Sequence, residues 1–366
     1  MIAAVLGTRP EIIKMSPIIR ECEARNLDYF ILHSGQHYSY EMDRAFFEEL
    51  ELPEPKYNLD VGSGTQAGQT AKIMAGIEDV LISESPDIVL IQGDTNTVMA
   101  GALAAAKLYI RVGHVEAGLR SFDRTMPEEI NRVVADHVSD YLFPPTEVAR
   151  QYLLREGIEE NKICMTGNTI VDAVSQNLVI SKKRANILDT LGLEPKGYFL
   201  VTSHRQENVD KPEKFRSIIA GLEAVRREYS LPVLFPMHPR TQKMVERFGF
   251  SLDGITVTNP IGFLEFLQLE SNARLVLTDS GGVQEEACIL GVPCVTLRSN
   301  TERPETIEVG ANVLAGTGAD EILRTAGQML AQSGTWENPY GDGMAGRMIV
   351  TICGGLPSRN NNSVIR

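Results

Sequence analysis

Residues 274–290 read RLVLTDSGGVQEEACIL, and this stretch decides the fold. It begins with a short apolar run, passes through two glycines and ends in a helix-like segment, Val283 to Leu290. An apolar run without strict alternation is typical of a parallel strand covered on both faces. Glycines let a backbone approach a ligand, and a helix start offers free N–H groups and a positive dipole end. The stretch predicts a strand–turn–helix unit suited to a diphosphate; the alternative is a plain tight turn with Ser280 as N-cap.

Similar apolar runs recur along the whole chain. The others are IAAVL from Ile2, YFILH from Tyr29, DIVLI from Asp87, RVGHV from Arg111, YLF from Tyr141, ICMTG from Ile163, YFLVT from Tyr198, PVLF from Pro232, ITVT from Ile255, PCVTL from Pro293 and NVLAG from Asn312. Segments with helical periodicity lie between them, for example 10–25, 70–83, 96–107 and 211–228. This alternation predicts a doubly wound α/β fold with parallel sheets.

The chain is long enough for two domains. Its 366 residues correspond to two units at about 150 residues per domain. The strand pattern pauses over residues 173–197, so we predict domains at 1–172 and 173–343. A helix around 344–356 is expected to pack back on the first domain, and the polar segment 357–366 is expected to be a disordered tail.

Composition argues against several classes of function. The chain has 35 Lys and Arg against 48 Asp and Glu, a net charge of −13, which disfavours general binding to nucleic acid or anionic membranes. No apolar stretch approaches the length of a membrane span. The five cysteines form no CxxC pair and no metal-ligand spacing, and GxGxxG is absent. We therefore expect a cytoplasmic protein with free thiols, no metal site and no nicotinamide cofactor.

Ligands of open α/β sheets bind beyond the carboxyl ends of the strands, so the residues that follow each run are candidates for a site. Arg9 follows the first strand at a predicted helix start, with Lys14 one turn on. A cation there opposes the helix dipole and suggests a bound anion, although a solvated arginine is the alternative. Glu286 suits a ribose diol because a carboxylate accepts two hydrogen bonds, or it merely complements the helix dipole.

Three carboxylates, Asp94, Glu116 and Glu128, also follow strands or begin a helix. Each alone fits a cap or a surface charge. Together with His204 and Arg205 they form a set that suits proton transfer, because clustered carboxylates raise one another's pKa. His33 and His137 are expected to pack in the core or behind the site.

In ten segments taken in order, the sequence resembles the non-hydrolysing UDP-N-acetylglucosamine 2-epimerases. The segments are GTRPEIIKMSPII, SGQH, GDTNT, GHVEAGLRS, MPEEINR, TGNTIVDA, SHRQEN, MHPR, LTDSGGVQEEA and TERPET, and they span most of the chain. The resemblance implies the GT-B architecture, in which two Rossmann-like domains face each other across a cleft. It also implies reversible conversion of UDP-N-acetylglucosamine to UDP-N-acetylmannosamine, by elimination of UDP to 2-acetamidoglucal and re-addition, without a cofactor.

The motifs also carry residue roles from the family. Acid/base roles fall on Asp94, Glu116 and Glu128, and a catalytic or leaving-group role falls on His204. Substrate and UDP contacts fall on Arg9, Lys14, Arg205, Phe266, Ser280, Gly281, Gly282, Glu286 and Arg303. Many bacterial members bind a second UDP-N-acetylglucosamine as an activator, which implies an allosteric site at Gln36, His37 and His238. A homodimer that serves polysaccharide biosynthesis is the further expectation.

Two alternatives remain open at this stage, and two others are disfavoured. The first is a related 2-epimerase that acts on a UDP-2,3-diacetamido sugar, and the second is a GT-B glycosyltransferase that uses a UDP-sugar. A non-catalytic UDP-sugar sensor would not need three acids beside a diphosphate. A hydrolysing epimerase usually carries an additional kinase domain, for which this chain has no room.

Overall fold

The computed structural model describes residues 1–36, 40–184, 186–332 and 334–357. The chain forms two compact units. Unit 1 comprises residues 1–175 together with the segment from Tyr340 onward, and unit 2 comprises Gln176–Pro339. Helix α7 (Thr169–Arg184) contains the first boundary, so the division falls inside a helix rather than in a loop.

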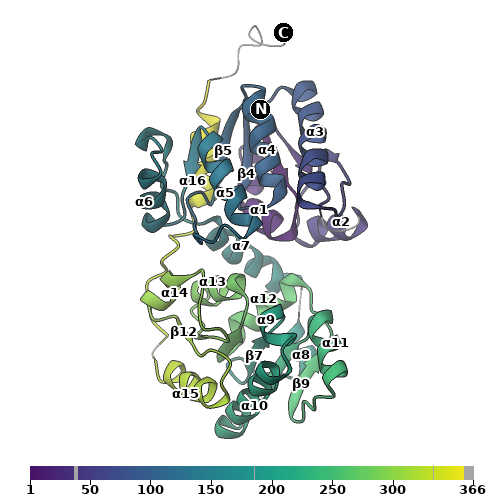
Figure 1. The fold of residues 1–366 in the computed structure, drawn as a ribbon, viewed down its shortest axis with the longest axis vertical. Helices are drawn as coiled ribbons and strands as arrows, with labels where there is room; N and C mark the ends of the chain where they lie inside the picture. Colours follow the sequence, from purple (N-terminus) through teal and green to yellow (C-terminus); the bar gives the residue numbers. More distant parts are fainter. Residues whose placement is uncertain (37–39, 185, 333, 358–366) are drawn as a thin grey trace. The chain divides into compact units, whose positions relative to one another are not determined.

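Unit 1 is a six-stranded parallel sheet flanked by helices (Figure 1). The strands lie in the order β3-β2-β1-β4-β5-β6. Their bounds are β1 Ile2–Leu6, β2 Tyr29–His33, β3 Tyr57–Asn58, β4 Ile88–Gln92, β5 Arg111–Val115 and β6 Tyr141–Phe143. The helices are α1 Arg9–Ala24, α2 Tyr40–Glu49, α3 Gln66–Glu84, α4 Asn96–Lys107, α5 Pro127–Val138, α6 Glu147–Arg155, the 3₁₀ helix η1 Glu160–Lys162, the first part of α7, and α16 Ala345–Gly354.

Unit 2 repeats this design with a second six-stranded parallel sheet, in the order β12-β11-β10-β7-β8-β9. Its strands are β7 Phe199–Thr202, β8 Val233–Pro236, β9 Ile255–Thr258, β10 Leu275–Thr278, β11 Cys294–Thr296 and β12 Asn312–Leu314. Its helices, besides the end of α7, are α8 Ile187–Leu191, α9 Gln206–Val209, α10 Pro212–Tyr229, α11 Pro239–Phe248, α12 Phe263–Asn272, α13 Gly281–Ile289, α14 Pro304–Glu308 and α15 Ala319–Leu330.

Numbered within its own unit, each sheet has the strand order 3-2-1-4-5-6 of a Rossmann fold. The predicted pair of doubly wound α/β domains is therefore confirmed. The order reverses between β1 and β4 in unit 1 and between β7 and β10 in unit 2. Crevices at such reversals are where doubly wound sheets bind ligands, so the loops after these four strands are the places to examine.

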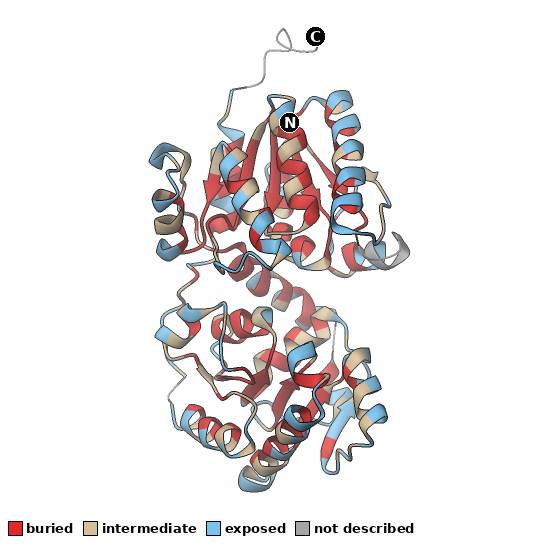
Figure 2. Ribbon diagram, viewed as in Figure 1, coloured by how far each residue is buried: buried red, intermediate tan, exposed pale blue. Residues whose placement is uncertain are grey.

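The central strands are buried on both faces (Figure 2). In unit 2, Phe199 and Val201 of β7 join a core cluster with residues of α10 and α15. Their neighbours Tyr198 and Leu200 join a second cluster, on the side of α12 and α13. Successive side chains of a strand point to opposite faces, so both faces of this sheet carry an apolar core. This explains why the apolar runs in the sequence show no alternation.

Two strand predictions need correction. The run ICMTG from Ile163 is not a strand, because it makes only an isolated bridge between Leu142 and Ile163. The edge strand β3 was not predicted, because two residues, Tyr57 and Asn58, are too few to form an apolar run. Helix α1 also begins one residue earlier than predicted, at Arg9, so that Pro10 is its second residue.

The segment after Tyr340 adds a helix to unit 1. Helix α16 packs against α1. The buried Asp172 carboxylate accepts hydrogen bonds from the backbone N–H groups of Ala345 (3.3 Å) and Gly346 (3.0 Å) at the start of α16. A Cβ atom on Gly346 would lie 2.9 Å from the side chain of Pro17, so glycine is needed for this close helix contact.

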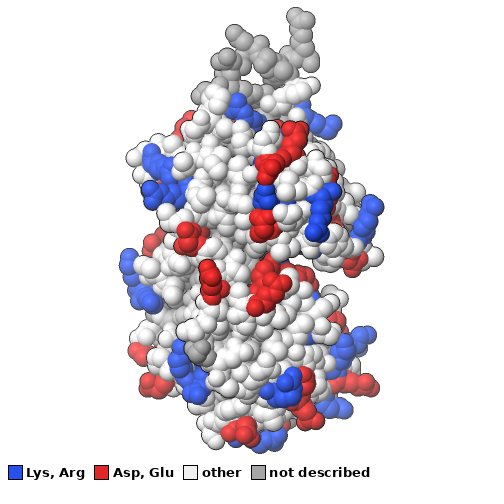
Figure 3. Space-filling view, turned by 90° about the vertical axis from the view of Figure 1, so that its left-hand side faces the viewer, with Lys and Arg blue, Asp and Glu red and all other residues white. Residues whose placement is uncertain are grey.

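The structure also locates the cysteines and the surface charges. All five cysteines are free, and four of them are buried. Among the described residues no helix is both long and apolar enough to cross a membrane. On the face drawn in Figure 3, acidic and basic side chains are interspersed in both units.

Candidate functional site

The site residues of unit 1 lie beyond the carboxyl ends of β1, β4 and β5, which are neighbours in the sheet. Gly7 follows β1, and a Cβ atom there would lie 2.1 Å from the Thr97 hydroxyl oxygen and 2.6 Å from that of Ser34. Glycine at this position is therefore a structural requirement, since any side chain would push the β1 and β4 loops apart.

Glu116, a predicted catalytic carboxylate, follows β5 in a left-handed backbone conformation with a φ of 68°. Non-glycine residues rarely adopt this conformation. Its backbone N–H donates to the Phe143 carbonyl over 3.1 Å. The strained backbone directs the Glu116 side chain back toward α1 and β4, where two partners hold it.

Those partners are Lys14 and Gln92. The Lys14 ammonium lies 2.6 Å from Oε1 of Glu116, and both side chains are nearly buried. The Gln92 amide donates to the other carboxylate oxygen, Oε2. The structure thus brings the predicted residues Lys14 and Glu116 together, and it adds Gln92, which sequence reasoning missed because a glutamine at a strand end carries no distinctive signal.

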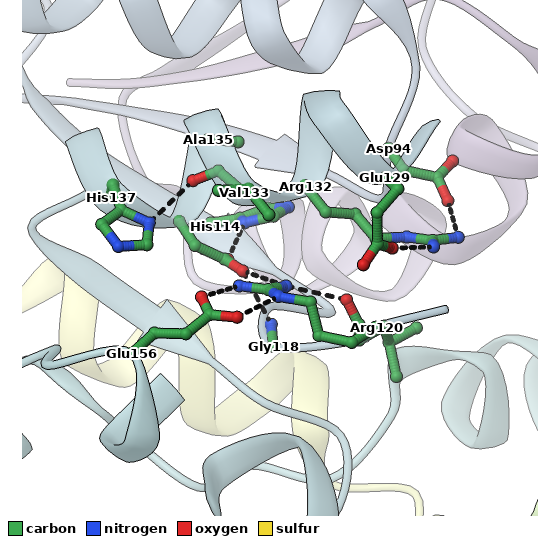
Figure 4. Close-up of polar contacts among 12 residues, drawn as sticks. Asp94, His114, Gly118, Arg120, Glu129, Arg132, Val133, Ala135, His137 and Glu156 are labelled. Atoms are coloured by element: carbon green, nitrogen blue, oxygen red, sulfur yellow. Dashed lines mark hydrogen bonds and ion pairs between the residues drawn. The ribbon is translucent and has the colours of Figure 1, made fainter. Parts of the chain in front are cut away.

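Asp94, the second predicted carboxylate, pairs with Arg132 of α5 over 2.5 Å (Figure 4). Arg132 also contacts Glu129 over 3.0 Å. The sequence predicted that the carboxylates would raise one another's pKa. In the structure the immediate ionic partner of each of these two carboxylates is a cation, Arg132 for Asp94 and Lys14 for Glu116.

Glu128 and Glu129 are adjacent but differ in their surroundings. Glu129 is buried, and its carboxylate accepts hydrogen bonds from the backbone N–H groups of Ser121 and Phe122, each over 2.9 Å. The hydrogen bonds and Arg132 outweigh burial, and they hold the pKa of Glu129 below its ordinary value. Glu128, the predicted catalytic residue, is exposed at the start of α5. Glu129 therefore orders the loop before α5, whereas Glu128 remains accessible.

Glu11 is a buried carboxylate that was not assigned from sequence. Its Oε2 accepts from the backbone N–H groups of Gly7 (2.6 Å) and Thr8 (2.8 Å), and its Oε1 accepts from the Thr95 hydroxyl (2.5 Å). It therefore joins the loops after β1 and β4. Burial raises the pKa of Glu11 to about 7, with a smaller contribution from Asp94. Thr8 and Glu11 stand at the spacing of a capping box, which is the sequence signal that points to this residue.

Arg9 and Gln36 complete the predicted residues of unit 1. The Arg9 guanidinium lies 5.4 Å from the centre of the Phe46 ring. Gln36 is buried, and its side-chain oxygen accepts from the Thr97 hydroxyl over 2.8 Å. His37 lies outside the described residues. Of the other histidines, His33 is buried against Phe47 as expected, but the expectation for His137 is wrong, because it is exposed on α5.

The loops of unit 2 are organised by Asp279, a fully buried carboxylate after β10. It accepts hydrogen bonds from the Ser203 hydroxyl (2.9 Å) and from the backbone N–H groups of His204 and Arg205 (3.1 Å each). Asp279 therefore joins the loops after β7 and β10, as Glu11 joins the corresponding loops of unit 1. In each unit, one buried carboxylate joins the two loops at the point where the strand order reverses.

His204 and His238 lie side by side in unit 2, with ring centres 5.6 Å apart. The Nδ1 atom of His204 is 3.5 Å from Asp279, and its side chain is partly exposed. His238 is the N-cap of α11, where its Nδ1 accepts from the Arg240 backbone N–H over 3.1 Å. Burial, His204 and Arg240 lower the pKa of His238, which agrees with a neutral ring that accepts at Nδ1.

The turn before α13 is open. Ser280 is the N-cap as anticipated, although its side chain makes no capping hydrogen bond. A Cβ atom on Gly281 would lie 3.8 Å from its nearest neighbour, and one on Gly282 would lie 4.0 Å away. Neither glycine has a positive φ. The fold itself would therefore accept a side chain at both positions, which distinguishes them from Gly7 and leaves room for a ligand at the helix start.

The other predicted residues of unit 2 have mixed surroundings. Glu286 is buried on α13, and Phe266 of α12 packs partly against the core. The Arg303 guanidinium contacts the buried Glu285 over 2.8 Å. Arg205 lies 3.6 Å from Glu302, which Arg298 holds in turn. Arg303 thus already has a structural partner in this unit.

The loop clusters of the two units have complementary chemistry. Unit 1 gathers carboxylates with paired cations, which suits acid/base work at carbon or oxygen. Unit 2 combines an open glycine turn at a helix start with two neighbouring imidazoles, which suits a diphosphate. Among the described residues, no group of three or more His, Cys, Asp or Glu side chains is arranged to hold a metal ion.

Comparison with known proteins gives consistent matches over the chain. The family model for UDP-N-acetylglucosamine 2-epimerase matches residues 20–354. UDP-N-acetylglucosamine 2-epimerase of Methanocaldococcus jannaschii is 56% identical over 96% of this chain and 98% of that protein. The crystal structure of the M. jannaschii enzyme in complex with UDP-GlcNAc and UDP has a TM-score of 0.85, covering 96% of this chain and 99% of that one. UDP-2,3-diacetamido-2,3-dideoxy-D-glucuronate 2-epimerase of Pseudomonas aeruginosa is 42% identical over 95% of this chain and 98% of that protein. The resemblance found in the motifs is confirmed.

Proposed function

The chain belongs to the UDP-N-acetylglucosamine 2-epimerase family, and we propose on that basis that it interconverts UDP-N-acetylglucosamine and UDP-N-acetylmannosamine. The reaction inverts C2 of the sugar, whose proton is not adjacent to a carbonyl carbon. The C2 proton therefore cannot be removed by simple enolisation. Elimination and re-addition of the nucleotide provide the route.

In the forward direction a carboxylate takes the C2 proton while the bond between C1 and the UDP oxygen breaks. The products are 2-acetamidoglucal and UDP, and both must stay bound. UDP then adds back to C1, and a protonated side chain delivers a proton to the opposite face of C2. The reaction is redox-neutral: one proton leaves C2 and one proton, which exchanges with solvent, is delivered to its opposite face.

We assign the proton transfers to Asp94, Glu116 and Glu128. The Lys14 ammonium, 2.6 Å from Glu116, favours the ionised form that a base requires. Glu128 is exposed and can meet a ligand directly. The observation that carries this assignment is the nearly buried ion pair between Lys14 and Glu116, because it joins two residues that the motifs predict for the same site.

We assign the nucleotide to the loops of unit 2. The start of α13, at Ser280, Gly281 and Gly282, offers backbone N–H groups to the diphosphate. Glu286 would accept from the ribose hydroxyls, and Phe266 would contact the uracil. The remaining predicted contacts are Arg9, Lys14, His204, Arg205 and Arg303, which would stabilise the departing UDP.

Proton NMR in D₂O tests the function. The protein is incubated with UDP-N-acetylglucosamine, and the expected result is deuterium at C2 together with an anomeric signal of UDP-N-acetylmannosamine. Absence of exchange at C2 would exclude epimerisation. Release of free sugar and UDP would indicate hydrolysis instead.

We further propose that a second UDP-N-acetylglucosamine activates the enzyme at Gln36, His37 and His238. The 5.6 Å between the rings of His204 and His238 supports this, because a ligand on His238 would adjoin a predicted catalytic residue. Initial rates starting from UDP-N-acetylmannosamine alone should show a lag that added UDP-N-acetylglucosamine removes. A full rate from the first moment would contradict activation.

The P. aeruginosa relative favours a second candidate substrate, a UDP-2,3-diacetamido uronic acid. Parallel assays of C2 exchange with both sugars decide between them. We also propose a cytoplasmic homodimer that supplies precursors for polysaccharide biosynthesis. Light scattering at several protein concentrations tests the dimer.

A further inference from the structure

His114 is a fully buried histidine whose two ring nitrogens both face acceptors. On strand β5 it precedes Glu116 by two residues. Its Nδ1 lies 2.7 Å from Oδ1 of Asp136, and its Nε2 lies 2.8 Å from the carbonyl oxygen of Gly93. A carbonyl oxygen can only accept a hydrogen bond, so Nε2 must carry a proton.

The Asp136 side of the ring leads to the same conclusion. Oδ2 of Asp136 accepts from the Arg120 guanidinium over 2.7 Å and from the Gly118 backbone N–H over 3.2 Å. These donors hold Asp136 as a carboxylate, which can only accept from Nδ1 of His114. Both ring nitrogens are therefore protonated, and the ring is an imidazolium.

Two further charged groups, Arg120 and the exposed Glu156, continue the chain of ion pairs from Asp136. Arg120 contacts Asp136 over 2.7 Å. It also donates to both carboxylate oxygens of Glu156, over 2.7 and 2.6 Å (Figure 4). Two cations thus face two anions. Burial and Arg120 lower the pKa of His114, but Asp136 and the Gly93 carbonyl outweigh them and raise it above its ordinary value.

The Gly93 carbonyl belongs to the peptide group that links Gly93 to Asp94, and this group is planar. A hydrogen bond to that carbonyl therefore fixes the direction in which the chain enters Asp94. The Gly93 N–H donates to the Val115 carbonyl over 3.1 Å, and the Asp94 carbonyl accepts from Asn131 over 2.9 Å. His114 thus supplies the central one of three contacts that hold this turn.

We propose that His114 is a positioning residue: as an imidazolium it orients the peptide group before Asp94 and so aims the Asp94 carboxylate at the sugar. The proposal rests on the proposed function for its view of Asp94 as an acid/base group. A buried histidine that served stability alone would not need both of its protons for turnover.

Two substitutions test the roles of the two ring nitrogens of His114 separately. His114→Gln places an amide near Nε2 and can still donate to Gly93, whereas His114→Asn places an amide near Nδ1 and cannot. Loss of one hydrogen bond from a charged donor corresponds to roughly tenfold in rate or more. We expect kcat for C2 exchange to fall by at least about tenfold in His114→Asn with KM little changed, and to fall less than about threefold in His114→Gln.

The pH profile supplies a second readout. Among the described residues, Asp136 and the Gly93 carbonyl contact the ring directly, and Arg120 and Glu156 extend this group of charges. Loss of the Nε2 proton at alkaline pH should lower kcat in the wild type. His114→Gln, whose amide does not titrate, should lack this decline. A role in stability alone would leave the shape of the profile unchanged.

Nitrogen-15 NMR of histidine-labelled wild type observes the ring directly. We expect both ring nitrogens of His114 to be protonated at neutral pH, with the signal assigned by its loss in His114→Gln. The exposed His137 of the same region is the matched control, because His137→Gln should change neither this signal nor kcat. A neutral His114 ring, or equal rates for the Asn and Gln variants, would overturn the proposal.

The possible outcomes distinguish failure of the His114 proposal from failure of the proposed function. If the wild type shows no C2 exchange, the proposed function fails, whatever the state of the ring. If the wild type exchanges but both variants behave alike, only the inference fails. Where a variant does not fold, the wild type alone decides: the NMR midpoint of His114 must coincide with the alkaline midpoint of kcat, and separate midpoints overturn the inference.

Discussion

Glu116 keeps a left-handed backbone that costs roughly 1–2 kcal/mol in a non-glycine residue. Its side chain recovers part of this cost through Lys14 and Gln92. Both contacts need the carboxylate in one place, so the strain and the two partners together fix its direction. A general base that removes one particular proton from its substrate reacts faster when its carboxylate is held in the correct orientation.

Glu116→Gln should therefore reduce kcat for C2 exchange by about 100-fold or more, the usual range for loss of an acid/base group. The amide cannot take a proton, and it no longer pairs with Lys14. The measurement is deuterium incorporation from D₂O under saturating substrate. The exposed Glu228 of α10 provides the control, because Glu228→Gln should retain the wild-type rate. Near-normal turnover of Glu116→Gln would remove this carboxylate from the mechanism.

Glu11 makes a prediction about pH and stability. Burial raises its pKa from an ordinary 4.5 to about 7, so the folded protein holds this proton more tightly than the unfolded chain does. Its contribution to the free energy of unfolding is therefore greatest below pH 4.5, and it falls by about 3 kcal/mol as the pH rises to 7. Glu11→Gln should lack this decline.

Urea unfolding at several pH values measures the difference between Glu11→Gln and the wild type. That difference should shift in favour of the variant as the pH rises from 4.5 to 7. A difference independent of pH would show that the Glu11 carboxylate ionises normally in the folded protein.

Sequence reasoning found the residues whose motifs are distinctive and missed those whose roles depend on burial. Asp94, Glu116 and His204 stand directly after apolar runs, where a ligand is expected. Asp279 also follows such a run, but a carboxylate that collects backbone N–H groups across 75 residues is recognisable only once the loops are folded. His114 lies within the motif GHVEAGLRS, but its role was not predicted, because its two partners are 21 and 22 residues away.

At the level of elements, two glycine turns that look alike in sequence differ in purpose. Gly7 before α1 is needed by the fold, because a Cβ atom would collide with Thr97 and Ser34. Gly281 at the start of α13 has open space around it. The free space at α13 is what a diphosphate would use, since the helix start offers N–H groups there.

Gly281→Ala should leave the free energy of unfolding unchanged or raise it by up to about 1 kcal/mol, because alanine is the better helix former. It should weaken UDP binding markedly, since the methyl group occupies the space that the diphosphate needs. Calorimetry of UDP binding and urea unfolding measure the two effects. Gly7→Ala is the opposite case and should destabilise the protein by several kcal/mol through overpacking. Unchanged UDP affinity in Gly281→Ala would place the diphosphate elsewhere.

The prediction of strands succeeded for every apolar run except the one from Ile163, and it missed the two-residue strand β3. The runs from Ile2, Tyr29 and Asp87 all became strands, because each supplies side chains to both faces of a buried sheet. The run from Ile163 is equally apolar but makes only one bridge to Leu142 at the edge of the sheet. Periodicity cannot distinguish these cases, since the difference lies in the partner strand.

On the scale of the whole molecule, unit 1 is assembled from two stretches that are far apart in the chain. The Asp172 carboxylate holds the second stretch by accepting from two N–H groups at the start of α16. The sequence predicted a helix around 344–356 that packs on this domain, but the contact of Gly346 with Pro17 required the folded structure.

Asp172→Ala should lower the free energy of unfolding of unit 1 by about 1–2 kcal/mol, the usual cost of losing a helix cap. Hydrogen exchange read by mass spectrometry should show faster exchange in α1 and α16, with unit 2 unaffected. The exposed Asp253 offers the control, and Asp253→Ala should match the wild type. Equal loss of protection in both units would mean that they unfold as one.

Since unit 2 is inserted between two stretches of unit 1, the chain enters it at Gln176 and leaves it at Pro339. A mechanical load applied between β1 and α16 would therefore act on unit 1 alone while both elements stay in place. Tension could reach unit 2 only after one of them had detached. In an optical trap the first rupture should belong to unit 1 even if unit 2 is the less stable of the two, because the order of rupture follows the path of the chain rather than the free energies.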